Sequence, residues 1–159
     1  MFHSRRILIV SLVAGLGFMS CYPFLAAQGP RPQPQWIWLG DKPGAEQTVY
    51  FRQEVVLKAR VTNVKLYGTC DNEMTVYING KEVLKSDSWE SPVFRDVTDH
   101  FRSPRKGDPE SRNVIAVKAQ NHGGAAGLLL RITFDSPKRE SQTVVTDNKW
   151  RASEKAEKG

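Results

Sequence analysis

The chain has 159 residues, of which 40% are hydrophobic and 25% charged, and its formal net charge is +6. This composition is that of an ordinary globular protein; it excludes a disordered or fibrous chain, and the length favours one domain. The surplus positive charge lies in segments that are interrupted or mixed in sign, without a basic stripe interleaved with stacking aromatic residues, so nucleic acid is not an expected partner.

Residues 1–27 have the layout of a secretory signal peptide. A basic start precedes an uncharged apolar run at 7–18, and small residues follow it. The run is too short for a membrane span, and no later segment is apolar enough to be one. We therefore expect cleavage after Ala27 and an exported protein, periplasmic or secreted, with lipid attachment at Cys21 as the less favoured alternative.

The segment after the leader divides into a linker, one domain and a tail. Residues 28–35 contain three prolines and predict an extended linker, 36–153 predict the folded domain, and 154–159 form a charged tail. Removal of the leader leaves Cys70 as the one cysteine, so no intrachain disulfide is expected. On the inward face of a strand, this thiol is expected to be a small buried hydrophobe rather than a reactive group.

Residues 48–57 and 64–70 predict two strands, because their apolar side chains recur at every second position. Gln53 interrupts the apolar face of the first strand. Gly68 in the second indicates either a bulge or a close approach of another backbone. The predicted inward faces comprise Val49, Phe51, Val55 and Leu57, then Val64, Leu66 and Cys70.

A β-hairpin is predicted over residues 74–84. Apolar and polar side chains alternate before Asn79-Gly80, and a second short strand follows this pair. Asn-Gly supplies the two positive φ angles that a type I′ turn requires. Met74, Val76 and Ile78 are therefore expected on one face of the hairpin, with polar residues on the other.

Three further strands are predicted at 92–97, 113–120 and 127–134. The segment 113–120 is apolar at almost every position, which favours a central strand covered on both faces. The segment 127–134 alternates apolar residues with polar ones. Helix is expected only as a single turn near Thr98, which would be its N-cap, with Phe101 folded beneath it.

These elements predict an all-β fold made of two packed antiparallel sheets, a β-sandwich or jelly roll. Short strands with turn signals between them are typical of this class, and no amphipathic segment of ten or more residues follows the leader. Trp36, Trp38 and Trp150 lie where the chain enters and leaves the domain, so we expect them to pack in the core or at its edge.

A series of motifs occurs in a characteristic order between residue 36 and about residue 153: Asp71-Asn72, Asn79-Gly80, Trp89, Asp96-Val97-Thr98, Asn113 to Val117, and Asn121 to Gly127. They resemble the galactose-binding-like jelly-roll domain at the N-terminus of α-L-rhamnosidases and similar domains appended to exported planctomycete proteins. The resemblance implies a non-catalytic domain associated with carbohydrate. The family usually continues into another strand, so this chain is expected to lack a closing strand or to receive one from a partner.

Carbohydrate recognition needs an aromatic face for the C–H surface of a sugar, and amides or carboxylates for its hydroxyls, all mounted on loops. Trp89 is the best aromatic candidate, with Asp87 beside it and Asn72 nearby. Asn121 and His122, in a Gly-rich loop, form the second candidate group. Two structural alternatives stay open: Trp89 could close one end of the core, and Asn121 could hold the turn of its own loop.

Enzyme and metal chemistry have weaker support. His100 and His122 are separated and lack a partner nucleophile, and the carboxylates fall in turns, where they cap backbone N–H groups. We expect a non-catalytic protein without a cofactor. Asp71, Asn72 and Asp87 could supply oxygen ligands to calcium, but they lack the spacing of an EF-hand and a turn-forming role is favoured.

The first functional hypothesis is therefore an exported, non-catalytic carbohydrate-binding accessory domain whose partner is a glycan or glycoconjugate. The alternative is a structural or protein-interaction module of an envelope assembly. In that case an open sheet edge would accept a strand from an envelope protein.

Overall fold

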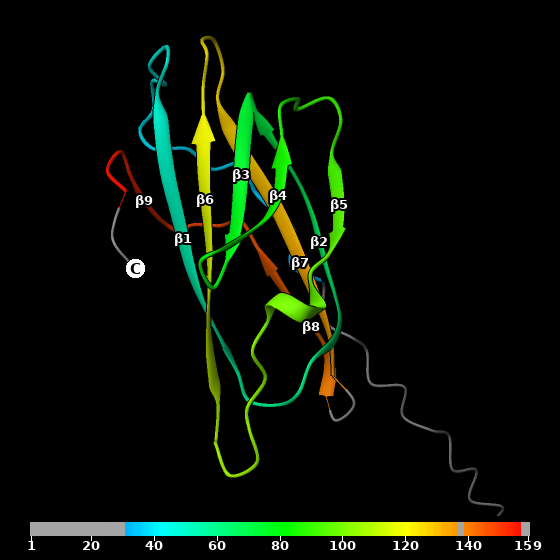
Figure 1. Cartoon of the computed structure of the whole chain (residues 1–159). Helices are drawn as coiled ribbons and strands as arrows, with labels where there is room; N and C mark the ends of the chain where they lie inside the picture. Colours follow the sequence, from blue (N-terminus) through cyan, green and yellow to red (C-terminus); the bar gives the residue numbers. More distant parts are fainter. Residues whose placement is uncertain (1–30, 137–138, 157–159) are drawn as a thin grey trace, which may run out of the picture.

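The computed structural model describes residues 31–136 and 139–156, so the predicted leader lies outside the described residues. The described residues form nine β-strands and one turn of 3₁₀ helix (Figure 1), and none of their helices is long and apolar enough to cross a bilayer. The elements are β1 (Thr48–Leu57), β2 (Thr62–Asp71), β3 (Glu73–Ile78), β4 (Lys81–Ser86), β5 (Val93–Asp96), η1 (Thr98–His100), β6 (Ser111–Gln120), β7 (Gly127–Ser136), β8 (Arg139–Val145) and β9 (Arg151–Ser153).

The strands form two antiparallel sheets that pack as the two layers of a sandwich (Figure 1). One sheet has the order β4-β3-β6-β1-β9 and the other has the order β5-β2-β7-β8. The predicted all-β sandwich is confirmed. Two strands were not predicted from periodicity: β8 pairs with β7, and the three-residue β9 pairs with β1 at the edge of the larger sheet.

The core lies between the sheets and consists of the side chains that the period-two pattern places inward. On β1 the four predicted apolar positions are at most 7% exposed, and on β2, β3 and β7 the corresponding positions are buried as well. Burial of each such aliphatic or aromatic side chain contributes about 1.5–3 kcal/mol. Packing of the two inner faces is therefore the main stabilising interaction of the domain.

The strand β6 lies at the centre of the larger sheet, as predicted, but the expectation that both of its faces are covered is wrong. Ile115, Val117 and Ala119 are buried on the inner face. Val114 and Ala116 on the outer face are only half-buried. The apolar character of the outer face belongs to a surface cleft, described below, and not to a second layer.

The predicted turn at Asn79-Gly80 is present, with φ angles of 51° and 80°. Its asparagine also fastens the hairpin to the neighbouring strand. Asn79 Oδ1 accepts a hydrogen bond from the Val114 N–H at 3.0 Å, and Asn79 Nδ2 donates to Asn113 Oδ1 at 2.9 Å. Because Asn113 is fully buried, this side-chain pair satisfies polar atoms that would otherwise be costly in the core.

The predicted single helical turn is confirmed as η1, but the prediction of Thr98 as its N-cap is wrong. Val97 occupies the capping position, and no side chain caps the helix. Instead, Asp96 Oδ1 accepts hydrogen bonds from the Thr98 N–H at 3.0 Å and the Thr98 hydroxyl at 2.7 Å. Phe101 is buried behind this turn and meets Phe134 edge-on, with 5.0 Å between ring centroids.

The three tryptophans near the ends of the domain pack differently. Trp150 is buried, and its indole N–H donates to a β8 carbonyl at 2.8 Å. Trp38 is half-buried and donates to Gln47 Oε1 at 2.8 Å. Trp36 is 53% exposed and lies over Gly127, where a Cβ atom would come within 2.6 Å of the ring. Trp36 thus packs at the surface and not in the core.

Residues 31–35 of the predicted linker have no regular secondary structure, but the end of this segment is attached to the smaller sheet. The Gln35 N–H donates to the Thr146 carbonyl at 2.9 Å, and the Thr146 hydroxyl donates to the Gln35 carbonyl at 2.7 Å. Ile37 then forms a bridge with Leu128.

The inner strand β2 contains two positions where size or chemistry is restricted. Gly68 pairs in continuous register with Leu130, so the close-approach alternative is confirmed and no bulge occurs there. A Cβ atom on Gly68 would overlap Leu130 Cδ2 and lie 3.0 Å from the Leu129 carbonyl oxygen.

Cys70 is fully buried, which confirms its role as a core residue. Burial, together with the charge of Asp71, raises the pKa of its thiol to about 12.

Replacement of Gly68 by alanine is expected to lower the free energy of unfolding by about 1–3 kcal/mol, because the new methyl group overpacks the contact between β2 and β7. Urea denaturation followed by circular dichroism measures this loss. Gly44→Ala is the matched control, since its Cβ would meet only Gln47 Cβ at 3.8 Å. Equal stability of Gly68→Ala and the wild type would contradict the packing described.

Candidate binding surfaces

Three loops at one end of the sandwich carry all five residues predicted to contact carbohydrate. Because β2, β4 and β6 run in the same direction, the turns that follow them lie together, at the top of Figure 1. These turns are residues 72, 87–92 and 121–126. The segment 40–47 joins them, since the Asn121 N–H donates to the Gln47 carbonyl at 2.9 Å. We name this surface the loop end.

Trp89 presents its ring to solvent from an anchored loop. Its side chain is among the exposed large hydrophobic groups, with 51% of its surface accessible. The backbone is held in place because the buried Thr69 donates its hydroxyl hydrogen to the Trp89 carbonyl at 2.8 Å. Asp87 is exposed in the same loop. The indole is therefore open to a ligand and does not lie enclosed beneath its loop.

Asn72 and Asn121 use their side chains to hold the loop end together. Asn72 Oδ1 accepts a hydrogen bond from the His122 N–H at 2.7 Å. Asn121 is only 1% exposed; its Nδ2 donates to the Gly44 carbonyl at 2.9 Å, and its Oδ1 accepts from the Gly123 N–H at 3.2 Å. This geometry matches the structural alternative for Asn121 and gives Asn72 a similar positioning role.

His122 lies between two carboxylates at the surface. Its Nε2 is 2.9 Å from Glu73 Oε1, and its Nδ1 is 3.3 Å from Glu46 Oε2. The hydrogen bond to Glu73, followed by the one to Glu46, raises the pKa of His122 above its ordinary value. The cluster thus combines an imidazole, whose protonated form its neighbours favour, with carboxylate oxygens that accept hydrogen bonds, within one exposed part of the loop end.

The calcium alternative gains no support from this geometry. In the part of the chain that the structure describes, no group of three His, Cys, Asp or Glu side chains is arranged to hold a metal ion. Asn72 Oδ1, one of the proposed ligand atoms, already accepts the hydrogen bond from the His122 N–H.

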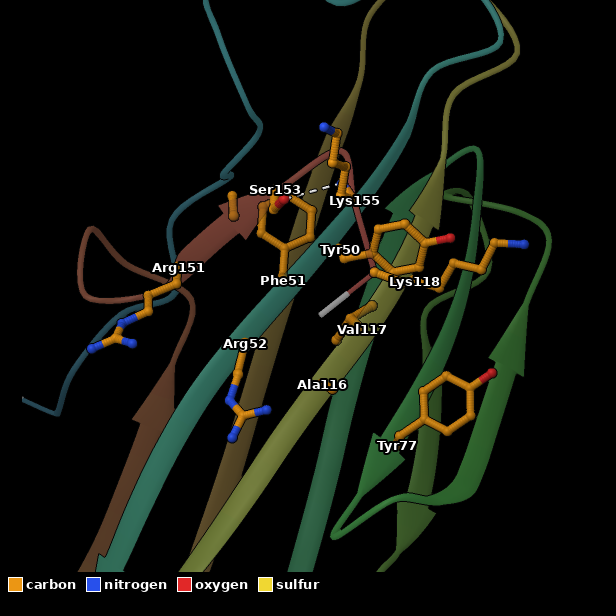
Figure 2. Close-up of a pocket in the computed structure, with 12 residues that line it drawn as sticks. Tyr50, Phe51, Arg52, Tyr77, Ala116, Val117, Lys118, Arg151, Ser153 and Lys155 are labelled. Carbon is orange, nitrogen blue, oxygen red and sulfur yellow. Dashed lines mark hydrogen bonds between the residues drawn. The ribbon is translucent and has the colours of Figure 1, made fainter. Parts of the chain in front are cut away.

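A second surface, which the sequence did not indicate, lies on the outer face of the larger sheet (Figure 2). A cleft of about 230 Å³ opens there over β3, β6, β1 and β9. Ala116 lies between Tyr77 and Arg52 in register across three strands, and Tyr50 lies opposite Lys118 in the next row. We name this cleft the basic groove. Its basic side chains are Arg52, Lys118, Arg151 and Lys155.

The basic groove could not be found from the sequence because its side chains belong to strands far apart along the chain. In the sequence, Tyr50 and Arg52 alternate with the inward residues of one predicted strand, and Tyr77 alternates with those of another. Each position looked like an ordinary solvent-exposed site. Only the strand order β3-β6-β1-β9 brings them together.

A third surface is apolar and lies on the outer face of the smaller sheet. Tyr67 and Phe94 are 47% and 53% exposed, and their rings contact each other with 4.8 Å between centroids. Lys65 Nζ lies 5.8 Å from the Phe94 ring centre. Beside this pair is a cavity of about 460 Å³, which is lined in part by Leu129 and Arg131. We name this surface the aromatic face.

No model of a known protein family matches the sequence. The chain is 28% identical over 130 residues to an α-L-rhamnosidase of Streptomyces avermitilis, and the match takes in 75% of this chain but only 12% of that enzyme. The chain therefore spans about an eighth of the curated relative that it matches.

Solved structures show the same limited overlap. The crystal structure of the Streptomyces avermitilis α-L-rhamnosidase complexed with L-rhamnose superposes with a TM-score of 0.69 and 25% identity, over 79% of this chain and 12% of the enzyme. The Pleurotus ostreatus lectin superposes with a TM-score of 0.64 and 23% identity, over 79% of this chain and 36% of the lectin chain. A GH78 rhamnosidase from Bacillus sp. GL1 has a TM-score of 0.61 and 24% identity, over 79% of this chain and 14% of that enzyme.

These likenesses confirm the resemblance seen in the motifs. The chain has the β-sandwich fold of a rhamnosidase domain and of a lectin, with lower sequence identity than would establish membership of a family.

The pKa of His122 is expected to fall toward its ordinary value of about 6.5 in Glu73→Gln, because that change removes the largest interaction that raises it. The measurement is an NMR titration of the imidazole. Glu82→Gln is the control, since Glu82 pairs with Lys85 at 3.4 Å on β4. The same His122 pKa in Glu73→Gln and the wild type would contradict the cluster.

The raised pKa of His122 makes the stability of the folded state depend on pH. The folded state binds the His122 proton more tightly than the unfolded state does. The cluster therefore stabilises the fold fully below pH 6.5 or so, and this stabilisation is lost as the pH rises through the higher folded-state pKa.

Proposed function

We propose that this protein is an exported, non-catalytic carbohydrate-binding accessory domain that binds its glycan at the loop end. The observation that carries the proposal is the Trp89 ring, which is 51% exposed on a loop whose backbone is fixed to β2 by Thr69. Because this loop is already anchored, little conformational entropy is lost when a ligand binds to it. An exposed aromatic ring on such a loop suits recognition of the apolar face of a sugar.

Other polar groups at the loop end suit the hydroxyls of a sugar. Asp87 is exposed in the same loop as Trp89, and the cluster of His122, Glu46 and Glu73 offers both donors and acceptors at the same end of the sandwich. Asn72 and Asn121 keep these loops in position through their bonds to backbone groups.

A binding role is favoured over catalysis by the arrangement of the carboxylates. A glycosidase places two carboxyl groups on opposite sides of the bond that it cleaves, with free space between them. Glu46 and Glu73 are instead hydrogen-bonded to the two nitrogens of one imidazole ring, which fills the space between them. The cluster is therefore better suited to holding a ligand than to hydrolysing it.

The sugars bound by the similar proteins support a sugar as the ligand. The rhamnosidase structure contains L-rhamnose, and the fungal protein is a lectin that has also been solved with GalNAc. L-Rhamnose and GalNAc are therefore the first sugars to test. The proposal of export rests on the predicted leader at residues 1–27, with the lipid anchor at Cys21 as its alternative.

Trp89→Ala is expected to weaken glycan binding by about fivefold to thirtyfold, since stacking on an exposed ring contributes roughly 1–2 kcal/mol to such a complex. The measurement is affinity on a glycan array, followed by calorimetry with the best ligand. Phe94→Ala is the matched control, because Phe94 is similarly exposed, at 53%, on another surface. Unchanged affinity in Trp89→Ala, with folding intact by circular dichroism, would refute binding at the loop end.

The second candidate function, a protein-interaction module of an envelope assembly, is favoured by the aromatic face. Phe94 and Tyr67 are exposed, and Phe94 lies on β5, which is an edge strand of the smaller sheet. An edge strand with exposed aromatic side chains suits the addition of a partner strand.

This second function predicts that an envelope protein is retained by the wild type and by Trp89→Ala, but is lost in Phe94→Arg. Pull-down from an envelope extract, followed by reconstitution with the purified partner, measures this. Glycan binding with no such retention would favour the first function.

A further inference from the structure

We propose that the basic groove is a second binding site, separate from the loop end, and that it takes an acidic polysaccharide whose sugar units carry carboxylate or sulfate groups. The groove lies on the outer face of the larger sheet, whereas the loop end lies where the strands terminate (Figures 1 and 2). The proposal does not depend on what the loop end binds.

The first argument is unbalanced charge. Four basic side chains line the cleft, and among the residues that the structure describes no carboxylate lines it. In the described residues, none of these four takes part in an ion pair. The nearest acids on these strands have other partners: Glu54 pairs with Arg112 at 2.6 Å, and Glu154 accepts a hydrogen bond from Gln47 Nε2 at 2.8 Å. A concave surface that carries several positive charges, without negative charges to neutralise them, attracts anions.

The second argument is the position of the arginines. Arg52 and Arg151 face the same side because they are direct partners in the pairing of β1 with β9. Figure 2 shows both of them on one side of the cleft, with Lys118 and Tyr77 on the other. Two planar guanidinium groups in one place suit carboxylate or sulfate, since each of these anions can accept paired hydrogen bonds.

The third argument is length. A neighbouring cavity of about 320 Å³ is also lined by Arg52 and Arg151, together with Lys149, Gln53 and Glu54. The carboxylate of Glu54 in this cavity pairs with Arg112 at 2.6 Å. The two arginines therefore border both cavities. Two cavities joined by shared cations suit an extended anionic chain better than a single small anion.

The fourth argument distinguishes a saccharide from other polyanions. Tyr50, Tyr77 and the small Ala116 leave an open cleft of about 230 Å³, which is below the roughly 300–1,000 Å³ of sites for drug-sized ligands. This space suits about one pyranose ring, whose C–H face can lie against a tyrosine. Single-stranded nucleic acid instead needs a succession of rings on which consecutive bases stack.

The experiment uses the protein without its predicted leader, and heparin and polygalacturonate as sulfated and carboxylated probes. The wild type is expected to bind at least one of them, with affinity that falls as salt increases. Arg52→Gln/Arg151→Gln is expected to lose at least about tenfold in affinity, because a lost hydrogen bond to a charged group corresponds to a factor of this size or more. Biolayer interferometry measures the affinities.

Two further variants separate a built groove from diffuse positive charge. Arg60→Gln/Arg105→Gln removes the same charge from exposed positions elsewhere and is expected to bind within about twofold of the wild type. Ala116→Leu keeps every charge but fills the floor of the groove, so it is expected to abolish most of the binding. Thermal unfolding shows whether each variant is folded.

Several outcomes would overturn the proposal. These are no binding of either acidic probe, equal losses in the two arginine variants, or full binding by a folded Ala116→Leu variant. Single-stranded DNA that binds more tightly than both polysaccharides at equal ionic strength would assign the groove to nucleic acid instead. Trp89→Ala is expected to bind the acidic probes like the wild type, so failure of this proposal and failure of the loop-end proposal are distinguishable.

Discussion

Burial of alternate side chains between two antiparallel sheets is the interaction on which the rest of this structure depends. Each long strand gives one apolar face to the common core, and Gly68 allows β2 and β7 to approach where a larger side chain would collide with Leu130. The core is free of disulfide chemistry in the described residues, with Cys70 packed as an ordinary apolar group. Because the inner faces of the two sheets are buried against each other, only the loops and the outer faces are accessible to a ligand.

The same alternation decides where the recognition surfaces lie. Strands that run in one direction deliver their loops to one end, so the loops that carry Trp89 and His122 lie at the same end of the sandwich although they are far apart in sequence. A hydrogen bond donated by the Thr69 hydroxyl and one accepted by Asn72 Oδ1 then hold these loops against the sandwich. On the larger sheet, outward side chains of β1, β3, β6 and β9 form the basic groove. The proposed binding surfaces thus rest on paired strands and anchored turns.

Local sequence patterns were sufficient to predict the strands from β1 to β7 and the turn at Asn79-Gly80, because period-two burial and positive φ angles depend on neighbouring residues, but they did not predict β8 or β9. They also identified the loop that carries Trp89. They could not predict strand order, and this explains two differences. The outer face of β6 was expected to be covered, although Ala116 forms the floor of a groove, and the partnership of Arg52 with Arg151 became visible only when β9 was placed beside β1.

Chemical-shift mapping of the backbone amides during titration with L-rhamnose and GalNAc tests the central claim, that a rigid β-sandwich binds sugar at the loop end. We expect changes confined to residues 40–47, 72, 87–92 and 121–126, with the core amides unchanged. Absence of changes with every sugar tried, or changes centred on the aromatic face around Tyr67 and Phe94, would contradict this claim.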